Sequence, residues 1–97
     1  MIRHLVAFRF HESVSRSDRE ALLLELEALP SRFAAMRGWT SGANRSERDD
    51  TFEHAFVVDF DAEEELRAYL NSDEHEAFVR ERFRPLVAQR AIVSFEC

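Results

Sequence analysis

Alternation of apolar and polar positions marks two stretches of the chain as β-strands. Along Met1–Phe10, one of the two alternating rows is apolar except for a single imidazole, that of His4. Along Phe52–Phe60, the corresponding row is apolar except for His54. A period of two puts each row on one face of a sheet. The opposite row of the first strand is also apolar at its centre, which is typical of a strand covered on both faces.

Two further stretches have weaker strand patterns. Trp39–Ser46 is polar and contains Gly42, which favours a position at the edge of a sheet. The last strand is expected over Ala88–Phe95, with three apolar residues on one face and Ile92 on the other. The sequence therefore predicts a sheet of four strands.

The segment after the first strand has the spacing of an amphipathic helix. Leucines recur at i, i+4 and i+7, at Leu22, Leu26 and Leu29. Ser17 with Glu20 fits a capping box. Ser15 with Asp18 is a competing start, and the pattern does not separate the two. Pro30 is expected to stop the helix soon after its last leucine.

A second and a third helix are expected between the third and the last strand. Asp61 with Glu64 forms another capping-box pattern, and Tyr69 lies on the apolar face of the helix that follows. Asn71–Ser72 interrupts this helix, and its serine can cap the next one, which ends at Pro85.

The predicted order of elements is β-α-β-β-α-α-β, with the first and third strands central because they are the most apolar. With right-handed crossovers, this order gives an α+β, ferredoxin-like fold, in which one face of an antiparallel four-stranded sheet carries the helices. The other face then exposes an apolar patch that is large for a monomer. Its residues are Leu5, Ala7, Ala55, Val57, Ala91, Val93 and Phe95. We expect a homodimer through this sheet face, with the two sheets closing into a barrel.

Length and composition narrow the functional classes. The 97 residues are expected to form one domain, 1–97, and 45% of them are hydrophobic, which is enough for a core. The net charge is −6 and no basic run occurs, so nucleic acid is not an expected partner. Apolar runs of at most four residues predict neither a membrane-spanning helix nor a signal peptide. The single cysteine, Cys97, excludes an intrachain disulfide, and we expect a cytoplasmic protein.

Four segments carry a resemblance to a known family. They are Ile2-Arg3-His4-Leu5-Val6 at the start, Phe52-Glu53-His54-Ala55 at the third strand, Tyr69-Leu70-Asn71-Ser72-Asp73-Glu74-His75-Glu76-Ala77-Phe78 across the second and third helices, and Ile92-Val93-Ser94-Phe95 in the last strand. Together they make the chain resemble the stress-responsive A/B-barrel (Dabb) domain family, of the dimeric α/β-barrel superfamily, over nearly its whole length.

The resemblance implies the place of a site without naming a substrate. Most members of this family have no established activity. Its best-defined enzyme, the plant olivetolic acid cyclase, is a cofactor-free polyketide cyclase that uses histidines and a tyrosine between sheet and helices. The matching positions here are His4, His54, Tyr69 and His75. Many members have His-Pro-x-His before the third helix, where this chain has Ser72-Asp73-Glu74-His75, so a particular substrate does not transfer.

Each candidate residue also has a plain structural interpretation. A histidine on an apolar row, such as His4, is more often a neutral core residue, although His54 on the same face favours a pocket. His75 falls near N3 of its helix, where the helix dipole disfavours the imidazolium, so the neutral ring could act as a base. The structural interpretation of His75 is an exposed residue at the start of a helix. Tyr69 is either a core aromatic or a hydrogen-bond donor to an oxyanion. Arg90 is expected to be an outward or rim charge.

Two functional hypotheses follow. In the first, which the resemblance implies, His75 abstracts a proton from a polyketide-like or other small oxygenated substrate, and an intramolecular aldol cyclisation follows. Tyr69 and His54 would stabilise the enolate, while His4 would orient a substrate oxygen. In the second, the protein is a non-catalytic stress-response or ligand-binding dimer. A heme-free monooxygenase on the same barrel is a third option, since that fold hosts one.

The ligand expected in either case is small and hydrophobic or aromatic. No cofactor is expected, because the chain has no Gly-rich phosphate loop and no nucleotide fingerprint. No metal is expected either, because no close His/Cys spacing occurs.

Overall fold

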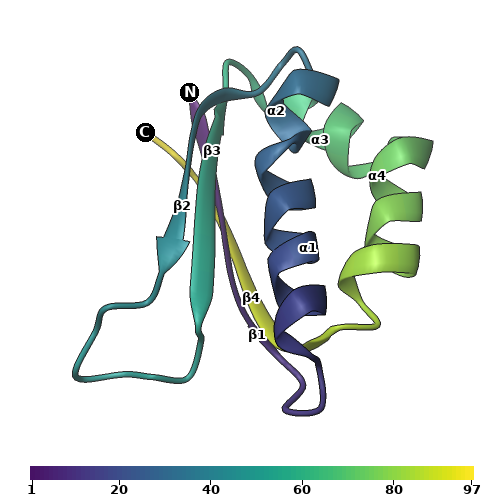
Figure 1. Cartoon of the computed structure of the whole chain (residues 1–97). Helices are drawn as coiled ribbons and strands as arrows, with labels where there is room; N and C mark the ends of the chain where they lie inside the picture. Colours follow the sequence, from purple (N-terminus) through teal and green to yellow (C-terminus); the bar gives the residue numbers. More distant parts are fainter.

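The computed structural model covers residues 1–97 and has one four-stranded sheet with the helices on one of its faces (Figure 1). In chain order the elements are β1 (Ile2–Phe10), α1 (Arg16–Glu27), α2 (Leu29–Arg32), β2 (Arg37–Ala43), β3 (His54–Phe60), α3 (Glu63–Leu70), α4 (Asp73–Phe78), the π-helical segment η1 (Val79–Phe83) and β4 (Val87–Glu96). The predicted α+β, ferredoxin-like class is confirmed. None of the helices is long and apolar enough to span a bilayer.

The strand order is β2-β3-β1-β4, so the two strands with the clearest alternation are central, as predicted. All neighbouring strands are antiparallel. In the register, His4 lies opposite Val58 of β3 and Ser94 of β4. His54 lies opposite Phe8, further along β1. The two histidines therefore share a face of the sheet but lie at different ends of it.

The hydrophobic core lies between the sheet and the helices. The predicted leucine face is buried, with Leu22 and Leu26 on α1 and Leu29 on α2. The buried apolar residues are Val6, Phe8, Phe10, Leu22, Leu26, Leu29, Met36, Phe56, Val58, Phe60, Leu66, Tyr69, Phe78 and Phe83. Because strand residues alternate between faces, this packing leaves the other side of the sheet without a cover in the single chain.

That uncovered side, which we call the outer sheet face, carries the apolar patch predicted from the alternation. Val93 and Phe95 of β4 remain 53% and 46% exposed. In the register, Leu5 of β1 lies between Val57 of β3 and Val93 of β4. One end of the face is polar, since the Arg3 guanidinium donates to both carboxylate oxygens of Asp59 at 2.9 and 3.0 Å. The centre of the outer sheet face is therefore apolar.

Several element boundaries differ from the predicted ones. Of the two starts that the sequence left open for α1, the structure has the one at Ser15, whose side-chain oxygen accepts the backbone N–H of Asp18 at 3.1 Å. Pro30 does not end the helical region; it lies in the first turn of α2, where its missing N–H removes no hydrogen bond. The N-cap of α3 is Ala62, with no side-chain hydrogen bond.

The edge strand β2 also begins earlier than predicted. Gly38 has a φ of 58°, a backbone conformation that a residue with a Cβ rarely adopts. It lies where the register of β2 against β3 shifts, between Arg37 and Thr40. The glycine therefore supports an irregular start of the strand that alternation does not reveal.

Candidate functional site

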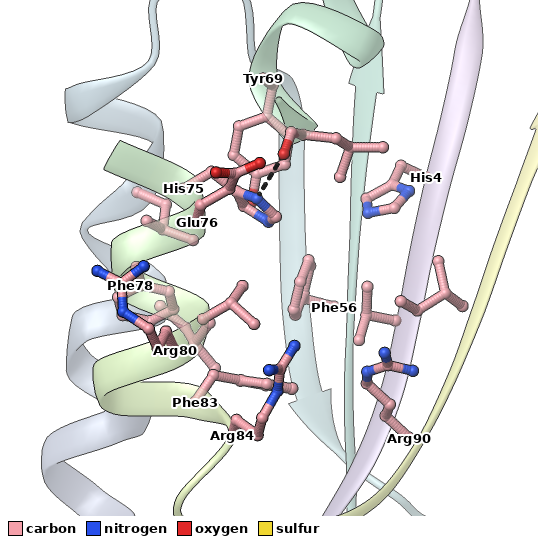
Figure 2. Close-up of a pocket in the computed structure, with 16 residues that line it drawn as sticks. His4, Phe56, Tyr69, His75, Glu76, Phe78, Arg80, Phe83, Arg84 and Arg90 are labelled. Atoms are coloured by element: carbon pink, nitrogen blue, oxygen red, sulfur yellow. Dashed lines mark hydrogen bonds between the residues drawn. The ribbon is translucent and has the colours of Figure 1, made fainter. Parts of the chain in front are cut away.

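A cavity of about 450 Å³ lies between the sheet and the C-terminal helical segments (Figure 2). Strands β1, β3 and β4 supply one wall, and α1, α2, α3, α4 and η1 supply the other. Its lining residues are His4, Val6, Leu26, Leu29, Phe56, Tyr69, Leu70, His75, Glu76, Phe78, Val79, Arg80, Phe83, Arg84, Arg90 and Ile92. The volume lies within the range of roughly 300–1,000 Å³ that is typical of sites for small molecules.

The first turn of α4 orients His75 toward this cavity. Ser72 is the N-cap, and its side-chain oxygen accepts the backbone N–H of His75 at 3.1 Å. The ring Nδ1 lies 3.1 Å from the carbonyl oxygen of Leu70. Since a carbonyl can only accept, Nδ1 carries the proton, and Nε2 of the neutral ring is a free acceptor. Figure 2 shows this second nitrogen on the cavity side of the ring.

Burial keeps the His75 imidazole neutral. Loss of solvent lowers the pKa of His75 below its ordinary value of 6.5, because the charged form is the one that needs water. The Leu70 carbonyl and the neighbouring Glu76 act in the opposite direction and offset only part of this shift. At neutral pH the cavity therefore contains a histidine that can accept a proton.

Tyr69, at the end of α3, lies directly against this histidine. The two ring centroids are 4.4 Å apart, and the tyrosine also stacks on Phe60 at 5.6 Å. Burial raises the pKa of the Tyr69 phenol well above its ordinary value of 10, so the hydroxyl keeps its proton. The backbone carbonyl of Tyr69 accepts a hydrogen bond from the Ser72 hydroxyl at 2.8 Å, which ties the end of α3 to the start of α4.

His4 supplies the sheet side of the site. It is 2% exposed, and its Nδ1 lies 2.8 Å from the Ser94 hydroxyl on the neighbouring strand. Burial lowers the pKa of His4, and the charge that His75 can carry lowers it further. Its ring centroid is 6.4 Å from that of Tyr69. The three rings therefore span the cavity from β1 to α4.

The structure does not place His54 with the other three residues. Its ring stacks on Phe8 at 5.8 Å and meets Phe10 edge-on at 5.9 Å. It lines a different hollow, between α1 and the β2 side of the sheet. The expectation that both strand histidines serve one pocket is corrected by the register, because a shared face does not imply a shared position along the strands.

Sequence reasoning missed part of the lining of the cavity. Arg80 and Arg84 come from η1 and the residue after it, where the Arg84 N–H donates to the Val79 carbonyl at 2.8 Å in a π-helical pattern. Such a widened turn has no reliable sequence signal, and it changes which side chains face inward. Arg90 was expected to be an outward or rim charge; it is exposed, lies on the helix-facing row of β4 with Ile92 and lines the cavity.

No cluster of three or more His, Cys, Asp or Glu side chains is placed to share an ion. The polar groups of the cavity are instead two imidazoles, one phenol, the carboxylate of Glu76 and guanidinium groups. These groups can accept a proton, donate a hydrogen bond and bind an anion.

Comparison with known proteins agrees with the fold and the family resemblance. The model of the stress-responsive A/B barrel domain, Dabb, matches residues 2–97. An uncharacterised protein of Streptomyces coelicolor is 31% identical over 81 residues, which is 81% of this chain and 84% of that protein.

Solved structures give the same result. A Dabb family protein with a ferredoxin-like fold from Mesorhizobium loti has a TM-score of 0.88 at 21% identity, over 99% of this chain and 95% of the other. A dimeric ferredoxin-like protein of unknown function from Thermobifida fusca has a TM-score of 0.82 at 28% identity, over 99% and 90%. The hydroxynitrile lyase of Passiflora edulis has a TM-score of 0.88 at 20% identity, over 97% and 90%. With its sequence matched from end to end by the family model, this chain belongs to the stress-responsive A/B barrel domain (Dabb) family.

Proposed function

We propose that this protein is a cofactor-independent enzyme that uses acid–base chemistry on a small oxygenated substrate in the sheet–helix cavity. The observation that carries the proposal is the contact of His75 Nδ1 with the Leu70 carbonyl, which leaves Nε2 free to accept a proton on the side of a largely apolar cavity, beside the Tyr69 ring. A neutral histidine near pH 7 and a hydroxyl that keeps its proton are the two groups that enolate chemistry requires. The name of the Passiflora lyase indicates that this fold includes enzymes.

The proposed reaction begins at a carbon next to a substrate carbonyl. Nε2 of His75 takes the proton, and the electron pair of the C–H bond moves onto the carbonyl oxygen. The Tyr69 hydroxyl donates a hydrogen bond to this enolate oxygen, and His4, held by Ser94, orients a second substrate oxygen. The enolate then attacks another carbonyl of the same molecule, and the imidazolium returns its proton to the new alkoxide. Atoms and charge balance without an added reagent.

The proposed assembly is a homodimer through the outer sheet face, with the two sheets facing each other. Several relatives of this fold are described as dimeric, including those of Thermobifida fusca and Bacteroides fragilis. The exposed side chains of Val93 and Phe95 support the same interface here, because a contiguous apolar face of this kind is unfavourable in water.

Turnover assays of His75 variants test the enzymatic proposal. Poly-β-keto acids and thioesters are incubated with the protein, and ring-closed product above the spontaneous rate is quantified by mass spectrometry. We expect His75→Ala to lower kcat/KM roughly a hundredfold to ten-thousandfold. His11→Ala is the matched control, since His11 is exposed and lies outside the cavity.

The pH profile of the same reaction is a second readout. The free base is lost as pH falls through the pKa of His75, which lies below 6.5 in the folded protein. We therefore expect kcat/KM to decrease only on the acid side of about pH 6.5 and to remain level up to the ionisation of Tyr69. A His75→Ala variant that turns over every accepted substrate like the wild type would refute this role.

A non-catalytic ligand-binding or stress-response dimer is the second candidate. The His4–Ser94 hydrogen bond favours it, because this contact satisfies a buried imidazole without any substrate. In this case ligands raise the melting temperature of the wild type but are recovered unchanged. Replacing His4 with Gln then lowers the melting temperature, because the buried contact with Ser94 is altered.

A further inference from the structure

We infer that the ligand of this cavity carries an anionic oxygen group, which Arg84 and Arg90 bind at the cavity mouth. The inference deepens the proposed function and depends on the cavity being a ligand site. It concerns the end of the cavity away from His75, where the family resemblance assigned no residue. Its starting point is the unequal distribution of ion pairs among the arginines.

The chain has 13 basic residues, and all of them are arginine. Eight are in ion pairs with carboxylates, at Arg3, Arg16, Arg19, Arg32, Arg37, Arg67, Arg80 and Arg82. Five are not, and two of these five, Arg84 and Arg90, line the cavity. Although the chain has 19 acidic residues, neither of these two guanidinium groups has a carboxylate partner, and both residues are exposed at the rim of the cavity.

The two arginines come from different elements and line the same end of the cavity. Arg84 directly follows η1, and Arg90 lies on the helix-facing row of β4. Both also line a neighbouring hollow of about 310 Å³, so they stand at the boundary between this hollow and the main cavity. Figure 2 shows their guanidinium groups at the end of the cavity opposite His75. Neither side chain donates a hydrogen bond to another protein group.

The charges along the cavity would orient a ligand. Glu76 lies beside His75, so an anion is repelled at that end. Apolar side chains, among them Phe56 and Phe83, line the middle. An amphipathic ligand therefore places its anionic group between the arginines, its apolar body on the phenylalanines and its oxygenated end at His75.

The chemistry of guanidinium restricts the anionic group. Its planar fork forms paired, charge-assisted hydrogen bonds with a carboxylate or a phosphate, and both groups fit this description. A neutral amide or ester offers the same shape without the charge. We therefore expect the cavity to bind an anionic ligand more tightly than a neutral ligand of the same shape. Binding experiments then show whether a carboxylate or a phosphate is preferred.

Matched probes test this selectivity by calorimetry on the purified full chain. Phenylbutyrate, its neutral analogue phenylbutyramide and phenylbutyl phosphate share one apolar body that is small enough for the cavity. We expect at least one of the two anions to bind about tenfold or more tightly than the amide at low ionic strength. The preference should shrink as salt is added, whereas the dissociation constant of the amide should change little.

Arginine variants locate the contact. Arg84→Gln and Arg90→Gln should each weaken binding of that anion about tenfold and leave amide binding unchanged. Arg45→Gln is the matched control, because it removes the same charge from an exposed loop residue outside the cavity. The anion whose binding responds, carboxylate or phosphate, identifies the head group.

The possible outcomes separate this inference from the proposed catalysis. Equal binding of anion and amide, or anion binding that neither Arg84→Gln nor Arg90→Gln weakens, overturns the inference, even if His75→Ala still abolishes turnover. Absence of binding for all three probes overturns it as well. Charge-selective binding that is retained in His75→Ala and lost in the two arginine variants supports it, even if no turnover is found.

Discussion

A single hydrogen bond decides what each cavity histidine can do. In His75 the Leu70 carbonyl fixes the proton on Nδ1 and leaves Nε2 open to a ligand. In His4 the Ser94 hydroxyl can donate or accept, so either tautomer is satisfied. The first arrangement is suited to a base, and the second is suited to a residue that adjusts its hydrogen bonds to a substrate oxygen.

One buried and two half-buried histidines should make the fold sensitive to mild acid. Burial lowers the pKa of His4, His54 and His75, whereas the unfolded chain titrates near 6.5. Between these values the unfolded state binds more protons, so the free energy of unfolding falls as pH decreases through this window. The pKa of Asp59 is lowered by Arg3, so the stability that the ionised Asp59 contributes is lost only at a pH near or below 3.8.

The measurement is urea denaturation at about pH 7 and about pH 5. We expect wild-type protein to be less stable at the lower pH, and His4→Gln to lose less stability between the two conditions because one titrating group is gone. His11→Gln should behave like wild type, since that side chain is exposed. Equal loss in His4→Gln and wild type would show that His4 is not one of the groups responsible.

At the scale of elements, the junction of α3 and α4 positions Tyr69 and His75 relative to each other. The Ser72 hydroxyl donates to the Tyr69 carbonyl, and its oxygen accepts the His75 N–H. We expect Ser72→Ala to cost about 1 kcal/mol of stability and also to weaken ligand binding, because both neighbours lose their anchor.

A second helix cap serves as the control for this effect. Ser15→Ala removes a similar hydrogen bond to Asp18 in α1 at a residue that does not line the cavity, and should cost about the same stability without changing ligand binding. Ser72→Thr retains the hydroxyl and should restore both properties. If Ser72→Ala and Ser15→Ala affect ligand binding equally, the junction has no special role. Melting curves and calorimetry measure the two properties.

Element type was predictable where one physical signal dominated. Alternation identified the central strands β1 and β3, and the leucine spacing identified the buried face of α1. Boundaries were less predictable, because Ser15 and Ser17 both fit a cap and only the packed helix decides between them. The prediction that Pro30 ends the helical region was wrong, because proline is also well suited to the first turn of a new helix, here α2.

The cavity needed the three-dimensional structure for a different reason. Tyr69 and His75 are close in sequence, so their meeting follows from the local turn. The separation of His54 from His4 depends on strand register, which alternation does not define. The arginine end depends on the π-helical turn at η1, which rotates the residues that follow it.

At the scale of the whole molecule, the two faces of the sheet have different surroundings. The helix side contains the cavity, and the outer sheet face contains an apolar surface without charges at its centre. A substitution on the outer sheet face should therefore change assembly while leaving the cavity-lining residues in place. The oligomeric state can therefore be tested separately from ligand binding.

Val93→Glu should convert a dimer into monomers. Val93 lies opposite Leu5 at the centre of the outer sheet face, and an unpaired carboxylate buried there would cost several kcal/mol. Sedimentation equilibrium should give about twice the 11.4 kDa chain mass for wild type and 11.4 kDa for the variant. Leu24→Glu, on the exposed surface of α1, should remain dimeric. A monomeric wild type would contradict the proposed dimer, and a Val93→Glu variant that stays dimeric would show that the interface lies away from the outer sheet face, because Val93 pairs with Leu5 within its apolar patch.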